Sequence, residues 1–280
     1  TGMGEFTRRG AGKALIGAGL AGAAAGIGAP AYSQANQRKT FVLVHGTWHG
    51  GWCWVKVADR LRAQGHRVIT PTATGCGERK HLISADTNLE THIQDFVNAI
   101  EWEELDDVIL IGHSFSGVTI TGVADRIPER IRHIAFFDAL IPTEDRPAAI
   151  MPDPETGAYP DWWVERMESF EDGYKMSFWD HYPVEMLVPE DDEENIAWLR
   201  RRLTWHPVGQ WLQPLSLENG GWEPHARTCI HCVGQIYSPS SERMVGPGRG
   251  PGWTFIELDV ARNGFMTDPE RVTECFLSLA

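Results

Sequence analysis

The sequence is short of basic residues. Its 25 lysines and arginines are outnumbered by 38 aspartates and glutamates, which gives a formal net charge of -13 at pH 7 and a pI near 5.3. Because the average field of such a chain repels polyanions, the composition argues against a nucleic-acid partner and against an anionic membrane surface. A small-molecule substrate or ligand is the partner that we expect.

Cysteine is also scarce. The chain has five cysteines, and an odd number leaves at least one thiol unpaired within a single chain. Cys229 and Cys232 form a C-x-x-C pair around His231, but the sequence has no second pair nearby to complete a tetrahedral zinc site. Because residues 228–233 alternate like a buried strand, we expect both thiols to pack as small apolar groups. We predict neither a metal nor any other cofactor.

Long apolar runs are missing as well. The segment from Ala14 to Ala29 is short and rich in glycine, which argues against a single-pass membrane anchor. It follows Arg8 and Arg9 and precedes Ser33-Gln34-Ala35, a small-residue cleavage pattern. This order resembles a twin-arginine export signal. We therefore expect residues 1–35 to be an export signal of a bacterial protein that is periplasmic or secreted when mature. A basic tail on a cytoplasmic protein is the alternative.

The rest of the chain, residues 36–280, has the pattern of a single α/β domain. Short β-branched runs alternate with helical patterns, which is typical of a mostly parallel sheet covered by helices, and 42% apolar residues suffice for one sizeable core. The predicted strands are 40–44, 66–70, 107–111, 131–137, 228–233 and 254–258. Apolar spacing predicts helices over 54–64, 90–102, 118–126 and 269–279.

The alternation stops between Ile141 and Ala226, where proline, tryptophan and acidic residues crowd together. We interpret residues 141–226 as a cap inserted over the sheet. Ligands of open α/β sheets bind beyond the carboxyl ends of the strands, and this insertion follows the strand that ends near Asp138. The tryptophans of the segment could line an apolar ligand pocket or pack the cap onto the body, and both uses remain open.

The strongest motif is Gly112-His113-Ser114-Phe115-Ser116-Gly117, which follows an apolar strand and precedes a helix. A nucleophile elbow has this context, because its tight turn lifts a serine hydroxyl above the sheet. The usual pattern is G-x-S-x-G, whereas here Ser116 takes the fifth position and glycine follows one place later. Since serine is also small enough for the helix to approach the strand, we predict that Ser114 is the catalytic nucleophile.

A second motif is the strand from Phe41 to Val44 with the glycine-rich loop that follows it. Such a loop donates one backbone N–H to an oxyanion hole, and the residue after the nucleophile donates the other. We therefore predict Thr47 and Phe115 as the donors. His45 and His49 could be catalytic, but loop histidines more often hold the turn through hydrogen bonds to the backbone.

These motifs together resemble a known family. The loop from His45 to Trp54, the segment Gly75-Cys76-Gly77-Glu78-Arg79, the Ser114 elbow and the run Asp138-Ala139-Leu140-Ile141-Pro142 are similar to the α/β-hydrolases, in particular the plant methylesterase and hydroxynitrile lyase branch and its bacterial relatives. The resemblance covers nearly everything after Lys39. It implies an α/β-hydrolase fold with an inserted cap, and an esterase or lyase that handles a small ester- or carbonyl-bearing substrate with the same serine.

The resemblance fails at two residues of the catalytic triad. In this fold the triad runs in the order serine, acid, histidine. The acid position falls on or near Gln235, and matching Met266-Thr267-Asp268-Pro269 to the closing motif puts Arg262 at the histidine position. No shift of alignment supplies a histidine, because His231 is the last one in the chain. Gln235 and Arg262 are therefore the vacated triad positions.

The loss has a chemical consequence. A serine hydroxyl is a weak nucleophile until a neighbouring base takes its proton, and a guanidinium stays protonated, so Arg262 cannot be that base. Binding and the oxyanion hole alone leave about 10³ to 10⁴ of rate enhancement over water. We expect an atypical hydrolase or lyase that polarises a carbonyl with Ser114. The alternatives are a ligand-binding pseudoenzyme, and a serine esterase or lactonase whose base is displaced or whose triad residues have been substituted.

Other polar residues are candidates for the missing roles. Asp138 and Glu242 could act as a displaced acid or base, and His81 and His225 could reach the site from the cap. The candidate substrate-binding residues are His45, His81, Asp138 and Arg262.

For Arg262 two arrangements remain open. Its guanidinium could lie beside Ser114 and bind a carboxylate or a developing enolate, since an unpaired buried charge requires a counter-anion. It could instead turn outward and pair with Asp259 or Asp268 at the rim.

Overall fold

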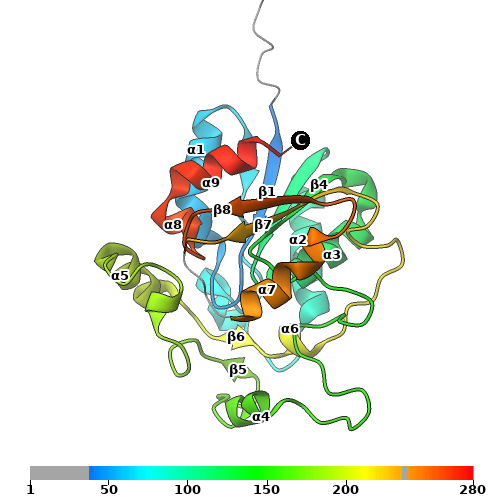
Figure 1. Ribbon diagram of the computed structural model, residues 1–280, viewed down its shortest axis with the longest axis vertical. Helices are drawn as coiled ribbons and strands as arrows, with labels where there is room; N and C mark the ends of the chain where they lie inside the picture. The colour runs from blue at the N-terminus through cyan, green and yellow to red at the C-terminus, as the bar shows by residue number, and fades with distance from the viewer. Residues whose placement is uncertain (1–37, 235–238, 280) are drawn as a thin grey trace, which may run out of the picture. The chain divides into compact units, whose positions relative to one another are not determined.

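The computed structural model describes residues 38–234 and 239–279. At their centre is a six-stranded sheet in the order β2-β1-β3-β4-β7-β8, with every neighbouring pair parallel (Figure 1). Its strands are β1 (Thr40–Val44), β2 (Arg67–Ile69), β3 (Val108–His113), β4 (Ile131–Phe137), β7 (Ala226–Cys232) and β8 (Thr254–Leu258). β3 is buried along its whole length, as its unbroken apolar run predicts for a central strand covered on both faces.

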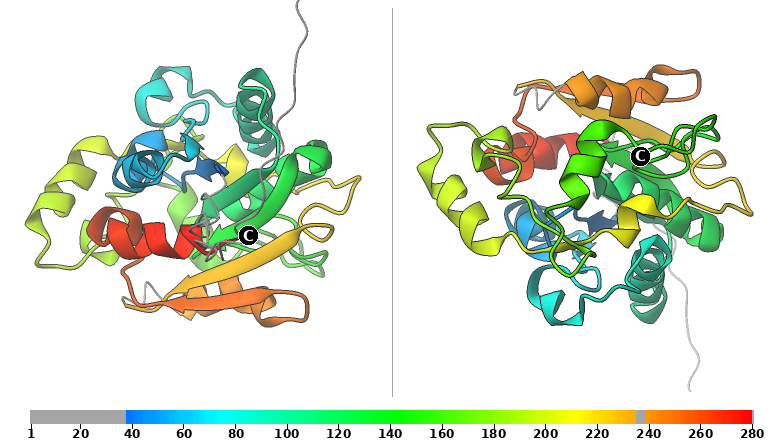
Figure 2. Two further views of the ribbon diagram at one scale, coloured as in Figure 1. Left: turned by 90° about the horizontal axis from the view of Figure 1, so that it is seen from above. Right: turned by 90° about the horizontal axis from the view of Figure 1, so that it is seen from below.

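Helices cover both faces of this sheet. On one face α1 (Val55–Ala63) packs against α9 (Pro269–Leu277), and on the other α2 (Leu89–Trp102) packs against α3 (Ser116–Arg126) (Figure 2). Asn88 starts α2 by accepting a hydrogen bond from the backbone N–H of Thr91, whose side chain bonds back in a capping box. The predicted α/β class is confirmed, and so are the four predicted helices, to within two residues at each end.

Residues 141–226, which we call the cap segment, run between β4 and β7. They contain the short elements α4 (Asp161–Met167), β5 (Lys175–Met176), η4 (Val184–Met186), α5 (Glu193–Arg202), β6 (His206–Pro207) and α6 (Gly209–Leu212). β5 and β6 form a two-stranded antiparallel ribbon. In Figure 1 the ribbon and α4 lie at the end of the sheet toward which β1 runs.

Hydrogen bonds tie the cap segment to the loop after β1. The indole N–H of Trp48 donates to the Met176 carbonyl at 3.0 Å, and the backbone N–H of Thr204 donates to the Trp48 carbonyl at 3.1 Å. The cap segment therefore covers the carboxyl edge of the sheet, where ligands of open α/β sheets bind.

The end of the cap segment is held by a buried carboxylate on α3. Asp125 accepts hydrogen bonds from the backbone N–H groups of Glu218, Asn219 and Gly221, at distances from 2.7 to 3.1 Å. Burial alone would raise the pKa of the Asp125 carboxyl, but these amide donors and Arg126 outweigh it and lower that pKa. The segment thus returns to the sheet at a fixed point on α3.

The five cysteines are all buried and none forms a disulfide. Cys229 and Cys232 lie in β7, where burial raises the pKa of Cys229 to about 12 and keeps its thiol protonated. Within the described ranges no helix has the length and apolarity needed to cross a membrane. Residues 1–35, the predicted export signal, lie outside the described residues.

Candidate active site

Ser114 follows β3 directly and occupies a strained backbone position. Its φ of 60° lies in the left-handed region that L-residues other than glycine rarely adopt. The Ser114 carbonyl accepts hydrogen bonds from the backbone N–H groups of Leu140, at 2.9 Å, and Gly117, at 3.2 Å. These bonds hold the turn between β3 and α3, and this geometry is that of a nucleophile elbow.

The departure from the usual elbow pattern has a structural reason. The Ser116 hydroxyl donates to the His113 carbonyl at 2.7 Å and to the Val44 carbonyl at 3.3 Å, so it ties the start of α3 to the ends of β3 and β1. Glycine is needed one place later, because a Cβ on Gly117 would lie 1.9 Å from the Leu140 carbonyl oxygen.

The loop after β1 lies directly against the elbow. A Cβ on Gly46 would lie 2.9 Å from the Cβ of Ser114, so glycine alone permits this approach. The backbone N–H groups of Thr47 and Phe115 donate to no acceptor in the described part of the chain, and the Trp211 indole fixes Thr47 by donating to its hydroxyl at 3.1 Å. Both amides are thus available as hydrogen-bond donors beside Ser114.

The two loop histidines hold this loop. His45 contacts the Gly46 carbonyl at 2.9 Å through Nδ1 and accepts from the Ala73 N–H at 3.1 Å through Nε2. His49 contacts the Thr47 carbonyl at 2.8 Å. Burial lowers the pKa of each imidazole to about 4, so both are neutral at pH 7. Both ring nitrogens of His45 thus contact backbone groups, and its role in substrate binding stays a prediction.

Arg262 lies in the loop between β8 and α8 (Gly264–Thr267), and its side chain is 2% exposed. Its Nη2 donates a hydrogen bond to the Ser114 hydroxyl oxygen at 2.7 Å. Its Nη1 donates to the carboxylate of Asp138. Arg262 therefore lies between the serine and an acid, as a catalytic histidine does in this type of site.

Asp138 follows β4 directly and is itself almost fully buried. Its φ of 43° is also left-handed, and the Asp138 N–H donates to the Ile230 carbonyl at 2.7 Å. The second carboxylate oxygen accepts a hydrogen bond from the Cys232 N–H at 3.3 Å. The sheet thus brings together Ser114, Asp138 and Arg262, which follow the ends of β3, β4 and β8, respectively. The three residues form a hydrogen-bonded Ser114–Arg262–Asp138 chain.

This arrangement decides between the two positions expected for Arg262. Pairing at the rim is wrong, because Asp259 and Asp268 lie near Arg271 instead, at 3.8 and 3.5 Å. The expected position beside Ser114 is found, but the counter-anion is Asp138 rather than a ligand carboxylate. No bound anion is needed to neutralise Arg262.

The remaining candidates lie elsewhere. Glu242 is exposed and contacts Arg249 at 3.0 Å and His231 at 3.6 Å. His225 contacts the Ile131 carbonyl, at the amino end of β4 and so at the opposite end of the sheet from Ser114. His81 is exposed on η2 (Gly77–Leu82). Gln235, predicted to be the vacated acid position, lies outside the described residues.

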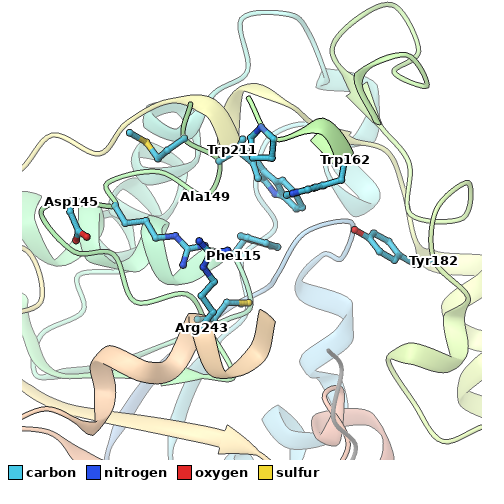
Figure 3. A pocket seen from close by; sticks show the side chains of 12 residues that line it. Phe115, Asp145, Ala149, Trp162, Tyr182, Trp211 and Arg243 are labelled. Carbon is cyan, nitrogen blue, oxygen red and sulfur yellow. The ribbon is translucent and has the colours of Figure 1, made fainter. Parts of the chain in front are cut away.

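A cavity of about 510 Å³ opens next to the elbow (Figure 3). Phe115, the residue after Ser114, lies in its wall and packs on Trp211 with ring centroids 4.1 Å apart. The cap segment supplies most of the other lining residues, among them Trp162 and Tyr182. Of the tryptophans in the cap segment, Trp162 and Trp211 line the cavity while Trp163 is fully buried, so both expected uses occur.

Comparisons with known proteins give the same assignment as the fold. Residues 41–274 match the alpha/beta hydrolase family. A carbendazim hydrolyzing esterase from Nocardioides sp. (strain SG-4G) is 37% identical over 250 residues, which cover 85% of this chain and 98% of that protein. Methylesterase 10 from Arabidopsis thaliana is 31% identical over 121 residues, or 43% of this chain and 44% of that protein.

Among solved structures, an extracellular alpha/beta-hydrolase from a Paenibacillus species, described as sharing structural and functional homology with tobacco salicylic acid binding protein 2, has a TM-score of 0.70. It is 24% identical, and the match covers 85% of this chain and 98% of that one. Such a likeness shows the fold alone. The predicted resemblance to plant methylesterases and their bacterial relatives is confirmed by the sequence matches. On the fold, the elbow and these relatives together, the chain belongs to the alpha/beta hydrolase family.

Proposed function

We propose that this protein is an esterase-type hydrolase for a small ester- or carbonyl-bearing molecule, with Ser114 as nucleophile and Arg262 beside it in place of a histidine. The observation that carries the proposal is the 2.7 Å hydrogen bond from Arg262 Nη2 to the Ser114 hydroxyl, within an intact elbow and loop. Relatives that are named esterases favour hydrolysis over a lyase reaction, and nothing in them supports a role limited to ligand binding.

In this proposal Ser114 Oγ forms a bond to the substrate carbonyl carbon. The resulting oxyanion accepts hydrogen bonds from the Thr47 and Phe115 amides. Its collapse breaks the bond to the alkoxide, which takes a proton from water and leaves as the alcohol, and a second water then hydrolyses the acyl-enzyme to the acid and free serine. Arg262 can only donate hydrogen bonds, so it stabilises the serine alkoxide rather than taking its proton. Asp138 balances the charge of Arg262 and fixes the plane of its guanidinium.

The proton of Ser114 passes to solvent hydroxide, because neither Arg262 nor the buried neutral histidines of the loop take it up near pH 7. The rate should therefore follow hydroxide concentration, with log kcat/KM rising by about one for each pH unit between about pH 6 and 9. A histidine base would instead give a plateau above an apparent pKa of about 6.5 to 7.

The test is the pH–rate profile of methyl ester and p-nitrophenyl acetate hydrolysis, with Ser114→Ala as the control. We expect a rising profile that the Ser114→Ala variant lacks, and a covalent fluorophosphonate adduct on Ser114 that mass spectrometry detects. A plateau near pH 7 would show that a histidine acts as base, and turnover retained by Ser114→Ala would exclude Ser114 as nucleophile.

We also propose that the enzyme works after export, as a periplasmic or secreted protein. The order of the basic, apolar and small-residue segments in residues 1–35 supports this proposal. Mass spectrometry of protein recovered from the periplasm or medium should find Asn36 as the first residue. An unprocessed chain found in the cytoplasm alone would contradict it.

A further inference from the structure

Two arginines, Arg146 and Arg243, lie in the wall of the cavity that Phe115, the residue after Ser114, also lines. We propose that they bind a carboxylate of the substrate, at the end of the molecule away from the reacting ester. That the other end of the molecule is an ester rests on the proposed function, whereas the carboxylate site rests on the cavity itself.

Hydrogen bonds connect the position of Arg243 to the elbow. Arg243 belongs to α7 (Pro239–Val245), and the carbonyl of the next residue, Met244, accepts a hydrogen bond from the Ile141 N–H at 3.2 Å. The preceding residue, Leu140, donates to the Ser114 carbonyl at 2.9 Å. In Figure 3 the Arg243 side chain extends from α7 into the cavity toward Phe115.

Arg146 lies at the start of the cap segment in a closed turn. Its backbone N–H donates to the Thr143 carbonyl at 2.9 Å, and the Thr143 N–H donates back to the Arg146 carbonyl at 3.3 Å. The two arginines therefore approach the cavity from separate segments that are each anchored by backbone hydrogen bonds.

Neither guanidinium forms an ion pair within the described part of the chain. In residues 38–234 and 239–279, neither Arg146 nor Arg243 makes an ion pair or a side-chain hydrogen bond, although acidic residues outnumber basic ones in the chain. Asp145 also lines the cavity, but its carboxylate accepts a hydrogen bond from the Thr143 hydroxyl at 2.7 Å. Burial, followed by the charge of Arg243, lowers the pKa of Arg146 and outweighs the opposing effect of the Asp145 carboxylate, so the two positive charges disfavour each other.

The chemistry of the wall defines the ligand. A planar guanidinium binds a carboxylate through two parallel hydrogen bonds, and a second guanidinium nearby adds attraction for the same anion. Around the arginines, the aromatic rings of Phe115, Trp162 and Trp211 favour an apolar body. The substrate class that fits is a half-ester with an apolar body between an ester group and a free carboxylate, and a cavity of about 510 Å³ holds a small molecule of this kind.

The test compares two matched substrates. One is monomethyl suberate, which has a carboxylate at one end, and the other is the neutral analogue in which a primary amide replaces that carboxylate. We expect the wild-type enzyme to prefer the carboxylate in kcat/KM by at least about tenfold. Arg146→Gln and Arg243→Gln should each reduce this preference several-fold, and the double variant should remove it. Higher salt should weaken it too.

Arg249→Gln is the matched control. Arg249 is also an exposed arginine near α7, but it pairs with Glu242 and Glu257 and does not line the cavity. Its replacement should leave the preference unchanged. Arg146→Lys and Arg243→Lys keep the charge and should retain part of the preference, which separates loss of charge from loss of structure. Equal kcat/KM for the two substrates in the folded wild-type enzyme would overturn the inference.

Binding to the Ser114→Ala variant separates this inference from the proposed function. Calorimetry of that variant should give tighter binding of monomethyl suberate than of the amide, with the difference lost on Arg146→Gln. If the wild type hydrolyses neither ester while this difference persists, the hydrolase proposal fails and the arginine site stands. If neutral esters are hydrolysed but the difference is absent, the arginine site fails and the hydrolase proposal stands.

Discussion

Replacing Arg262 with methionine should destabilise the protein strongly. Both side chains of the Arg262–Asp138 pair are 2% exposed, so the replacement leaves a carboxylate in the interior. Among its described partners only the Cys232 N–H, at 3.3 Å, then still donates to the Asp138 carboxylate. Breaking a buried pair in this way costs about 3–5 kcal/mol. For a domain of this size that loss corresponds to a fall in Tm of roughly 6–20 °C.

A double-mutant cycle measures the pairing itself. Urea unfolding at pH 7 of Arg262→Met, Asp138→Leu and the double variant should give a coupling free energy of at least about 2 kcal/mol, because the double variant leaves no unpaired charge. The control is Arg271→Met, whose partner Asp268 is half exposed, and it should change the free energy of unfolding by less than about 1 kcal/mol. Additive losses, or single variants as stable as the control, would refute a buried charge pair at Ser114.

Three further predictions concern the base, the loop and the elbow. Arg262→His should raise p-nitrophenyl acetate turnover at least about tenfold, because an imidazole takes up the serine proton; an unchanged rate in a folded variant would place residue 262 out of reach. The pKa of about 4 of His45 and of His49 lies below the unfolded value of about 6.5. Their contribution to the free energy of unfolding is therefore complete above pH 6.5. It is lost as the pH falls toward 4, by about 1.4 kcal/mol per pH unit for each histidine. His45→Gln should reduce this slope in urea unfolding experiments at a series of pH values. Gly117→Ala should lower both Tm and turnover, since the added methyl overlaps a carbonyl oxygen at 1.9 Å; wild-type values would contradict the close packing of α3.

Much of the fold could be predicted because its signals are local. β1, β4 and β8 have the predicted bounds, since each is a short run of mainly apolar or β-branched residues. The elbow around Ser114 and the loop at Thr47 could also be predicted from the sequence, because strand, turn and helix follow each other within a few residues. β5 and β6 were missed, as two residues per strand leave no alternation to detect.

The partner of Arg262 could not be predicted in the same way. Asp138, Asp259 and Asp268 were all available acids, and Asp259 and Asp268 lie much closer to Arg262 in the sequence. The choice depends on the strand order, which brings the ends of β4 and β8 to one edge of the sheet. That Arg146 and Arg243 line the same cavity could not be predicted either, because it depends on where the cap segment and α7 lie in space.

The contact of Arg262 with Ser114 and Asp138 also affects how this site can change by mutation. Two arginine codons, CGU and CGC, become histidine codons through one base change at the second position. Because the acid, the elbow and the loop after β1 are already assembled around residue 262, such a change would exchange a donor for a titrating base without any rebuilding of the neighbouring loops. Where one of these two codons specifies residue 262, a single nucleotide separates the present site from a serine, histidine and aspartate constellation, and the reverse step is equally short.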